Sequence, residues 1–101
     1  MKKEHRHLIE SHLYNYCQSG TDPRWTHLIA MHLSGLEEED LKLVELRYKE
    51  RKSEREICRR LHIEKSTYYA KITNIIQDLA IIAAYERLFN PGGSNARNES
   101  M

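Results

Sequence analysis

Residues 53–72, which read SEREICRRLHIEKSTYYAKI, most constrain what this chain can fold into. They contain two patterns typical of helices, separated by a short break. In the first pattern, Ile57 and Leu61 lie four residues apart and therefore share one face of a helix. Ser53 and Glu56 match the capping box, in which side chains satisfy free backbone N–H groups at a helix start. We therefore predict a short helix that begins just after Ser53.

A second helix is predicted to begin near Glu64 or Ser66. Its apolar residues fall at steps of three and four and predict one buried stripe, which comprises Tyr68, Ile72, Ile75, Ile76 and Leu79. Cys58 supplies the small side chain that the first helix needs where the second crosses it, and Ile63 would fill the turn. His62 occupies the turn position where many helix-turn-helix proteins have glycine, and histidine is among the residues that visit the left-handed region. Together the two segments predict a helix-turn-helix.

The predicted second helix leaves short, polar or cationic side chains at its N-terminal end, and such groups can approach base edges and phosphates in the major groove of DNA. Lys65 is the first choice for a phosphate or guanine contact, and Tyr69 would touch the sugar-phosphate backbone or a thymine methyl group. Glu64 would accept a hydrogen bond from cytosine N4 or repel the wrong sequence. The candidate DNA-binding residues are Arg55, Arg59, Arg60, Glu64, Lys65, Ser66, Thr67, Tyr69, Ala70, Lys71 and Thr73. The arginines and Lys71 are expected to contact phosphates, whereas helix capping by Ser66 or Thr67 is an alternative interpretation.

The distribution of charge agrees with a surface that binds phosphates. The whole chain has a formal net charge of only +1. Residues 41–73, in contrast, contain ten Lys and Arg against five Glu, a net charge of +5. A local cationic surface is what phosphate binding requires, although a basic helix face can also be merely solvated. The acidic run at residues 37–40 is predicted to be charge at a helix start, and a metal-binding or protein-binding patch is the less favoured interpretation.

A family resemblance is carried by Leu46, Arg47 and Tyr48, followed by Ser53, Glu56, Ile57, Leu61, Ile63, Ser66, Thr67, Tyr68 and Tyr69. These residues resemble the C-terminal module of the ArpU/RinA-type late-gene transcription regulators of phages and prophages of Gram-positive bacteria. That module is itself similar to region 4 of bacterial sigma factors. The segment HLIESHLYNY near the N-terminus resembles the opening of the same family, so the resemblance runs from about residue 7 to 89 with a looser middle. It implies a DNA-binding regulator of late genes, and the segment 19–34 matches nothing in it.

The remaining sequence also predicts helices, and no stretch shows the alternation of a strand. Residues 7–17 have helical spacing, and a second helix would start at the N-cap Asp22 with Pro23 at its first position and stop at Gly35. A third would run from about Glu37 to Tyr48. We therefore expect an all-α fold. Its parts would be an N-terminal helical segment (1–36) that packs on a helix-turn-helix module (37–89), followed by a disordered tail (90–101).

The last helix is predicted to be longer than groove reading requires, extending from Lys65 to about Phe89. Its C-terminal segment LAIIAAYERLF is apolar nearly all round and should be buried on more than one side. It could pack on the N-terminal helix of the same chain or on a second copy. A homodimer through this helix would place two recognition helices on half-sites about 34–36 Å apart or a multiple of that distance.

Several other classes of protein are disfavoured. The chain has 101 residues, which leaves room for one modest domain, and it has no glycine-rich phosphate loop or nucleophile motif. We expect no enzyme activity, no cofactor and no metal, since the six histidines lack ligand spacing. Neither a membrane span nor a signal peptide is predicted, which favours the cytoplasm of a bacterial host cell and reduced Cys17 and Cys58.

The hypothesis from sequence is a small, sequence-specific regulator of transcription that binds double-stranded DNA and acts on phage or prophage late genes. One alternative is a DNA-packaging protein that resembles a phage small terminase and assembles into rings. Another is a module that binds RNA polymerase or a sigma factor without reading DNA. The mass in solution distinguishes the first alternative, and charge reversal at Lys65 and Lys71 distinguishes the second.

Overall fold

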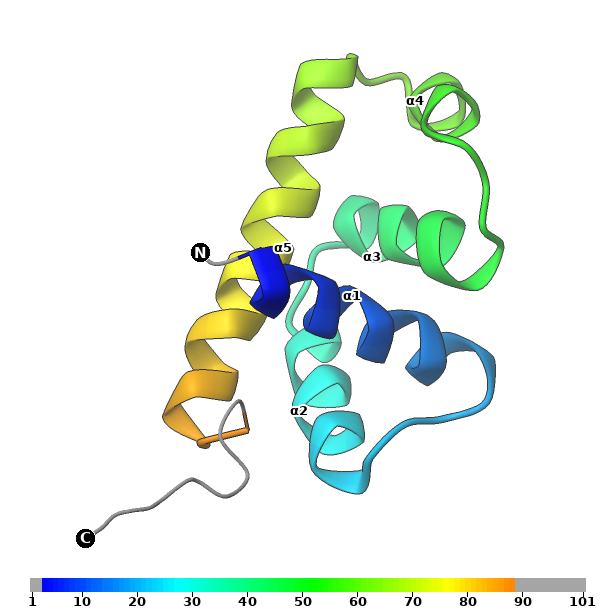
Figure 1. The fold of residues 1–101 in the computed structure, drawn as a ribbon. Coiled ribbons are helices and arrows are strands. Elements are labelled where there is room, and N and C mark those ends of the chain that lie inside the picture. Colours follow the sequence, from blue (N-terminus) through cyan, green and yellow to red (C-terminus); the bar gives the residue numbers. More distant parts are fainter. Residues whose placement is uncertain (1–2, 89–101) are drawn as a thin grey trace, which may run out of the picture.

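The computed structural model describes residues 3–88, and all regular secondary structure within them is helical, as predicted (Figure 1). The elements in chain order are α1 (Lys3–Gln18), α2 (Pro23–Ser34), α3 (Glu38–Val44), a π-helical turn η1 (Glu45–Lys49), α4 (Glu54–Leu61) and α5 (Lys65–Tyr85). The predicted disordered tail lies outside the described residues. Among residues 3–88, no helix combines the length and apolar character needed to cross a bilayer.

The first two helices form as their local signals predict. The described part of α1 starts at Lys3, four residues before the predicted start at position 7. In α2, the Asp22 side chain accepts a hydrogen bond from the backbone N–H of Arg24 at 2.8 Å, and Pro23 occupies the first turn. The helix ends at Ser34, where the N–H of Gly35 closes on the carbonyl of His32. The start of α2 is therefore set by side chains at the boundary itself, and its end by a backbone turn at Gly35.

The third helix differs from its prediction because its last turn is wider than an α-helix. One α-helix from about Glu37 to Tyr48 was expected, but the α-helical part ends at Val44 and a π turn follows. The N–H of Glu50 bonds to the carbonyl of Glu45 at 2.9 Å, which is the i to i+5 pattern of such a turn. Insertions of this kind are rare and occur often at functional positions. Here the turn carries Arg47 and Tyr48, whose side chains both point toward α1.

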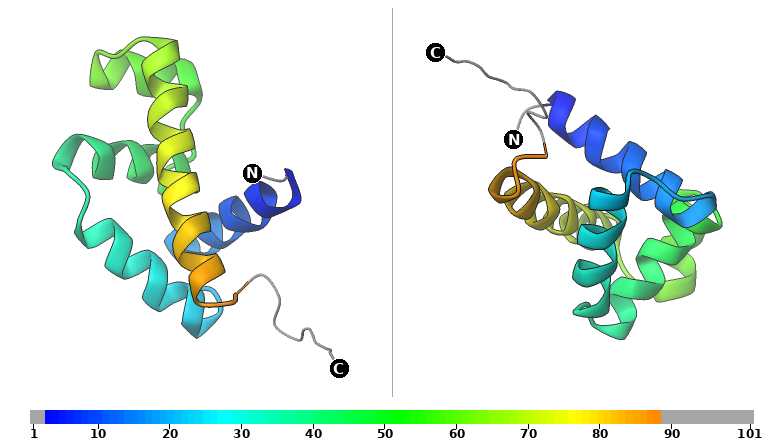
Figure 2. Two further views of the ribbon diagram at one scale, coloured as in Figure 1. Left: turned by 90° about the vertical axis from the view of Figure 1, so that its left-hand side faces the viewer. Right: turned by 90° about the horizontal axis from the view of Figure 1, so that it is seen from below.

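The long helix α5 is the centre of the arrangement (Figures 1 and 2). Its N-terminal end contacts α4, and further along it packs against α1 and α2. The helices α3 and α4, with the start of α5, form a three-helix unit at one end of the molecule. The two N-terminal helices lie beside the C-terminal half of α5 and extend the same core.

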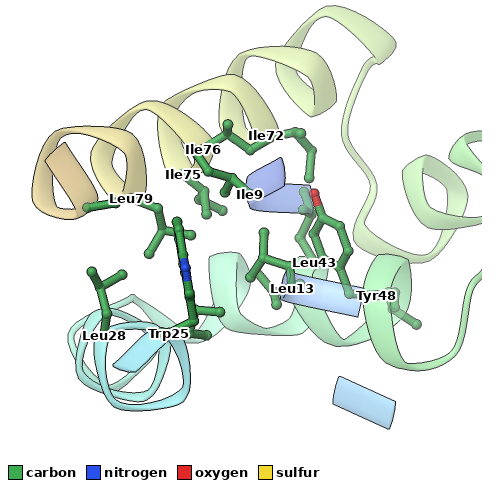
Figure 3. Packing of buried hydrophobic residues seen from close by; sticks show 14 of the residues in the cluster. Ile9, Leu13, Trp25, Leu28, Leu43, Tyr48, Ile72, Ile75, Ile76 and Leu79 are labelled. Atoms are coloured by element: carbon green, nitrogen blue, oxygen red, sulfur yellow. The ribbon is translucent and has the colours of Figure 1, made fainter. Parts of the chain in front are cut away.

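One continuous hydrophobic core joins these parts (Figure 3). The stripe predicted for α5 is buried in full, with every member at most 4% exposed. Leu13 of α1 and Leu43 of α3 pack against it. Trp25 of α2 is 3% exposed and stacks on the ring of His12 with centroids 4.3 Å apart. Burial of such an aromatic side chain contributes strongly to a small core. Trp25, which lies in the segment 19–34 outside the family resemblance, therefore has a structural role in the core.

The end of α5 was predicted wrongly. Continuation to about Phe89 was expected, but the helix ends at Tyr85. The N–H of Leu88 bonds to the carbonyl of Ala83 and that of Arg87 to Ala84, with Arg87 left-handed at φ 59°, which is a Schellman ending. Leu88 is consequently folded back and 5% exposed. The expected burial on more than one side is also not found within the chain, because Ile81 and Tyr85 remain exposed.

Candidate nucleic-acid interface

The turn between α4 and α5 has the geometry of a helix-turn-helix. His62 ends α4 in the left-handed conformation, with φ 57° and ψ 46°. The backbone N–H groups of His62 and Ile63 both bond to the carbonyl of Cys58, which closes the last turn of α4. The Ile63 side chain packs against the core, as does that of Cys58. The chain therefore reverses direction over residues 62–64 and places the start of α5 beside α4.

Ser53 caps α4, but only half of the predicted capping box forms. Its hydroxyl accepts a hydrogen bond from the backbone N–H of Glu56 at 3.2 Å. The Glu56 carboxylate does not return to Ser53 and instead accepts hydrogen bonds from Arg59 and Arg60, which lie one turn further along. These bonds lower the pKa of Glu56 below its usual range.

The first turn of α5 presents the predicted set of side chains. Lys65, Ser66, Thr67, Tyr69 and Ala70 are exposed, whereas Tyr68 between them is buried at 1% exposure. Glu64 is exposed as well, and its side chain does not cap the first N–H groups of α5. The first turn of this helix carries no acidic residue. A helix start of this kind favours an anion such as a phosphate group.

Glu54 of α4 connects the two most favoured candidates. The Tyr69 hydroxyl donates a hydrogen bond to one Glu54 carboxylate oxygen at 2.9 Å. The other carboxylate oxygen lies 4.0 Å from the Lys65 ammonium group. The hydrogen bond raises the pKa of Tyr69, because ionisation would place two negative charges side by side. Tyr69 also meets the buried Tyr68 ring edge to face, with centroids 5.2 Å apart, and keeps 44% of its surface exposed.

The arginines of α4 have different surroundings. Arg55 is exposed and makes no ion pair with any residue in the described part of the chain. Arg59 and Arg60 are paired with Glu56, although their side chains stay 74% and 47% exposed. A DNA phosphate can compete for such exposed pairs, since they contribute little to stability.

Lys71 is placed differently from the other candidates. Its ammonium group lies 2.7 Å from Asp40 and 3.1 Å from Glu39 of α3, and its side chain is 26% exposed. Hydrogen bonds to these two carboxylates raise the pKa of Lys71. The lysine therefore ties α5 to the acidic start of α3, and Thr73 beyond it is half-buried. Glu39 and Asp40 belong to the acidic run that was predicted to be charge at a helix start, and they thus also bond to α5.

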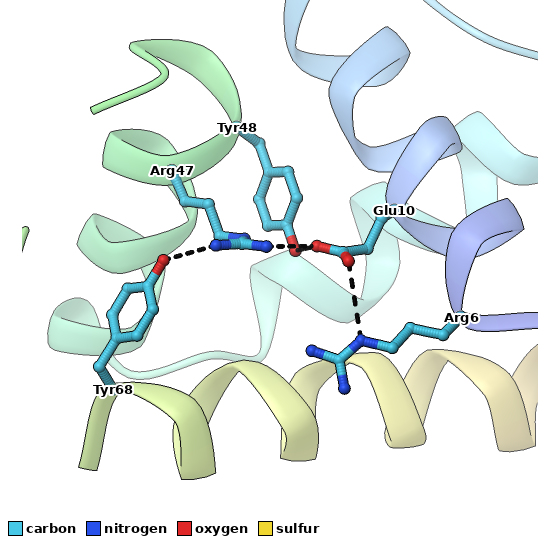
Figure 4. A network of polar contacts seen from close by, with 5 residues as sticks. All are labelled: Arg6, Glu10, Arg47, Tyr48 and Tyr68. Atoms are coloured by element: carbon cyan, nitrogen blue, oxygen red, sulfur yellow. Dashed lines mark hydrogen bonds and ion pairs between the residues drawn. The ribbon is translucent and has the colours of Figure 1, made fainter. Parts of the chain in front are cut away.

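A polar network at the start of α5 was not foreseen from the sequence (Figure 4). Arg47 donates one hydrogen bond to Glu10 of α1 at 2.8 Å and another to the Tyr68 hydroxyl of α5. The Tyr48 hydroxyl donates to the same Glu10 oxygen at 2.7 Å, and Arg6 lies 3.7 Å from the second oxygen. Three helical elements therefore meet at one carboxylate and one guanidinium group.

Burial and pairing act in opposite directions on the ionisation of this network. Burial alone would raise the pKa of Glu10, but hydrogen bonds from Arg47 and Tyr48 outweigh it and hold the pKa below its usual range. Burial raises the pKa of Tyr48 well above the usual tyrosine value, and the adjacent Glu10 charge raises it further. At neutral pH the network therefore contains an ionised glutamate, a charged arginine and two neutral tyrosines.

The positive charge of residues 41–73 is less available than the sequence count indicates. Five of its ten cations form ion pairs, namely Arg47, Arg59, Arg60, Lys65 and Lys71. Of the others, Lys49, Arg51 and Lys52 lie in or after η1, just before α4. Sequence reasoning did not select these three as candidates. Arg51 has a left-handed backbone at φ 56° and places its guanidinium group 4.8 Å from the Tyr14 ring centroid.

The histidines do not form a cluster. His12 Nδ1 and the Thr21 hydroxyl share a hydrogen bond of 2.6 Å, and the His12 ring stacks on Trp25. The ring therefore helps to join α1 to α2. Within residues 3–88 no group of three or more His, Cys, Asp or Glu side chains is arranged to hold a metal ion.

Comparisons of this chain with protein-family models, with curated proteins and with solved structures returned no match.

Proposed function

We propose that this chain is a helix-turn-helix protein that binds double-stranded DNA in a sequence-specific way and regulates transcription. One observation carries the proposal: the buried Tyr68 fixes the start of α5, while Lys65, Ser66, Thr67 and Tyr69 around it face solvent. Such a helix start offers donors and apolar contacts without disturbing the core. The resemblance to regulators of phage late genes suggests the biological setting.

In the proposed complex, the N-terminal end of α5 enters the major groove, which is about 12 Å wide and admits a helix. Lys65 contacts a phosphate or a guanine, and the Tyr69 ring packs on the sugar-phosphate backbone or a thymine methyl group. Arg55, which lies on α4, contacts a phosphate. The N–H groups at the start of α5 add to the attraction for phosphate.

Glu54 has two opposing effects in this proposal. Its carboxylate holds the Tyr69 hydroxyl and lies near Lys65, which fixes both side chains before DNA arrives. The same negative charge opposes nearby phosphates and so weakens binding to DNA of any sequence. The repulsion by Glu54 is therefore outweighed only on DNA whose bases provide additional contacts.

The first experiment is selection of binding sites from a pool of random duplexes, followed by fluorescence anisotropy on the selected duplex and on a scrambled one. The affinity for the selected duplex should exceed that for the scrambled duplex by about a thousandfold or more, and the logarithm of the association constant should fall linearly with the logarithm of salt concentration. No enrichment and no complex at low salt would contradict the proposal. Binding to RNA polymerase or a sigma factor by such a protein would then favour the alternative module.

Variants assign the binding to α5. Lys65→Met and Tyr69→Ala should each weaken binding to the selected duplex by about tenfold or more, because each base or phosphate contact contributes on this scale. Lys3→Met removes an exposed lysine at the start of α1, which is not part of the α4–α5 surface, and should leave the affinity unchanged. Equal losses in all three variants would indicate unspecific attraction. A ring of many subunits in solution would instead support the DNA-packaging alternative.

A further inference from the structure

A groove of about 860 Å³ lies between α2 and the C-terminal half of α5, at the opposite end of α5 from the proposed DNA surface. Its apolar lining comprises Leu28, Met31, Leu36, Ile82 and Leu88. Met31 is 62% exposed and Ile82 39% exposed, so the groove is open to solvent. Because most of this lining is apolar, its exposure to water is unfavourable.

An apolar ridge adjoins this groove on α5. Ile81 is 64% exposed and Tyr85 is 86% exposed. At about 100° per residue, Tyr85 and Ile81 lie roughly 60° and 100° around the helix from Ile82, which lines the groove. Groove and ridge therefore adjoin on the exposed side of α5, with Asp78 at the border between them, and exposed apolar surfaces of this kind mark sites of association.

The two walls of the groove carry opposite charges. The α2 wall has the cationic Arg24, and the α5 wall has the anionic Asp78 and Glu86. The ion pair of Arg24 within the described residues is with Asp22, 3.5 Å away at the start of its own helix, and does not cross the groove. The charged groups on both walls are therefore available to an incoming surface.

We infer that this surface binds a second copy of the same chain. A two-fold axis along the groove would place the α2 wall of one copy over the α5 wall of the other. The start of α2 and the end of α5 lie at the same end of the molecule (Figure 2), so Arg24 of each copy would face Glu86 of the other. The ridge residue Tyr85 would enter the partner's groove beside Met31. The surface is complementary to itself in this two-fold arrangement, because it has both a ridge and a groove and both signs of charge.

The inference goes beyond the proposed function and does not depend on it, because association is measured without DNA. Sedimentation equilibrium of the full chain should give a mass approaching twice 12.0 kDa as concentration rises. Tyr85→Asp should raise the dissociation constant of the dimer by more than about tenfold, since buried aromatic residues dominate such interfaces. Ser11→Asp introduces the same charge at an exposed position of α1, which does not line the groove, and should leave the constant unchanged.

Charge exchange tests the pairing of the walls. Arg24→Glu and Glu86→Arg should each weaken association when measured alone, because each places like charges opposite one another at both contacts. An equal mixture of the two variants should restore association, since both contacts in the mixed dimer then join opposite charges. A monomer at all concentrations up to about 1 mM, the weak end of measurable association, would overturn the inference. So would a dimer that Tyr85→Asp and the charge variants leave intact while circular dichroism shows all variants folded.

Discussion

Replacement of Arg47 by methionine tests whether the polar network at the start of α5 holds the three-helix unit to α1. Methionine keeps the apolar part of the side chain but removes the guanidinium group and its hydrogen bonds to Glu10 and Tyr68. Glu10 would retain only the Tyr48 hydroxyl and Arg6 at 3.7 Å. A partly buried carboxylate would thus lose its main counter-charge.

The expected cost follows from the burial of the pair. The side chains of Arg47 and Glu10 are 23% and 17% exposed. Removal of one partner from a fully buried ion pair costs about 3–5 kcal/mol, and residual solvent contact reduces this to about 2–3 kcal/mol here. For a domain of this size the melting temperature should fall by about 10–20 °C. The free energy of unfolding in urea at pH 7, followed by circular dichroism, provides the measurement.

The dependence on pH gives a second and independent test of the same network. The folded-state pKa of Glu10 lies below its ordinary value of 4.5, so the stability from its ionised form is present above that value and is lost as the pH falls through the folded-state pKa. The difference between wild type and Arg47→Met should therefore persist from pH 7 to about 5 and diminish below about 4.

A matched control uses an arginine in an exposed pair. Arg59→Met removes a cation that is 74% exposed and bonded to Glu56, and the free energy of unfolding should not change measurably. If Arg47→Met costs no more than Arg59→Met, or if its deficit grows as the pH falls below 4, the reasoning about the Glu10 pair is refuted.

Three further changes test single features of the helix-turn-helix. Ser53→Ala should lower the free energy of unfolding by about 1 kcal/mol, because the N–H of Glu56 loses its acceptor, and Ser53→Thr should restore most of it; equal stability of the two variants would contradict the cap. His62→Gly should raise the unfolding free energy by up to about 1 kcal/mol, because glycine adopts φ 57° without strain, and a lower stability in urea would count against this. Lys71→Met should reduce thermal stability yet weaken DNA binding less than Lys65→Met does in the anisotropy assay, since Lys71 is bonded to α3; equal losses of affinity would place Lys71 among the phosphate contacts.

Features encoded by neighbouring residues could be predicted from the sequence. The Ser53 cap, the left-handed His62 and the buried stripe of α5 each depend on residues within about one or two turns, and all three occur as expected. The Asp22 cap with Pro23 behind it belongs to the same class. Such signals act through local hydrogen bonds and periodic burial, and both can be read directly from spacing.

Features that depend on distant residues could not be predicted. Glu10 and Arg47 are 37 positions apart, and Asp40 and Lys71 are 31 positions apart. Nothing in their local spacing distinguishes them from solvated charges. The sequence therefore predicts a phosphate contact for Lys71 and no role for Glu10. The early end of α5 has the same origin, because Leu88 turns back into the core and leaves Arg87 with a left-handed backbone.

These distant contacts explain how a small domain can hold the start of α5, the helix proposed to read DNA, in one position. Tyr68 and Tyr69 are adjacent on α5, yet Tyr68 bonds toward Arg47 and Tyr69 bonds toward Glu54 of α4. One turn further, Lys71 bonds to α3. The start of α5 is therefore held by charged groups from three sides over a span of four residues, which fixes its rotation as well as its position. Fixed rotation is what base reading requires, since a helix that turns by one residue presents a different set of side chains to the groove.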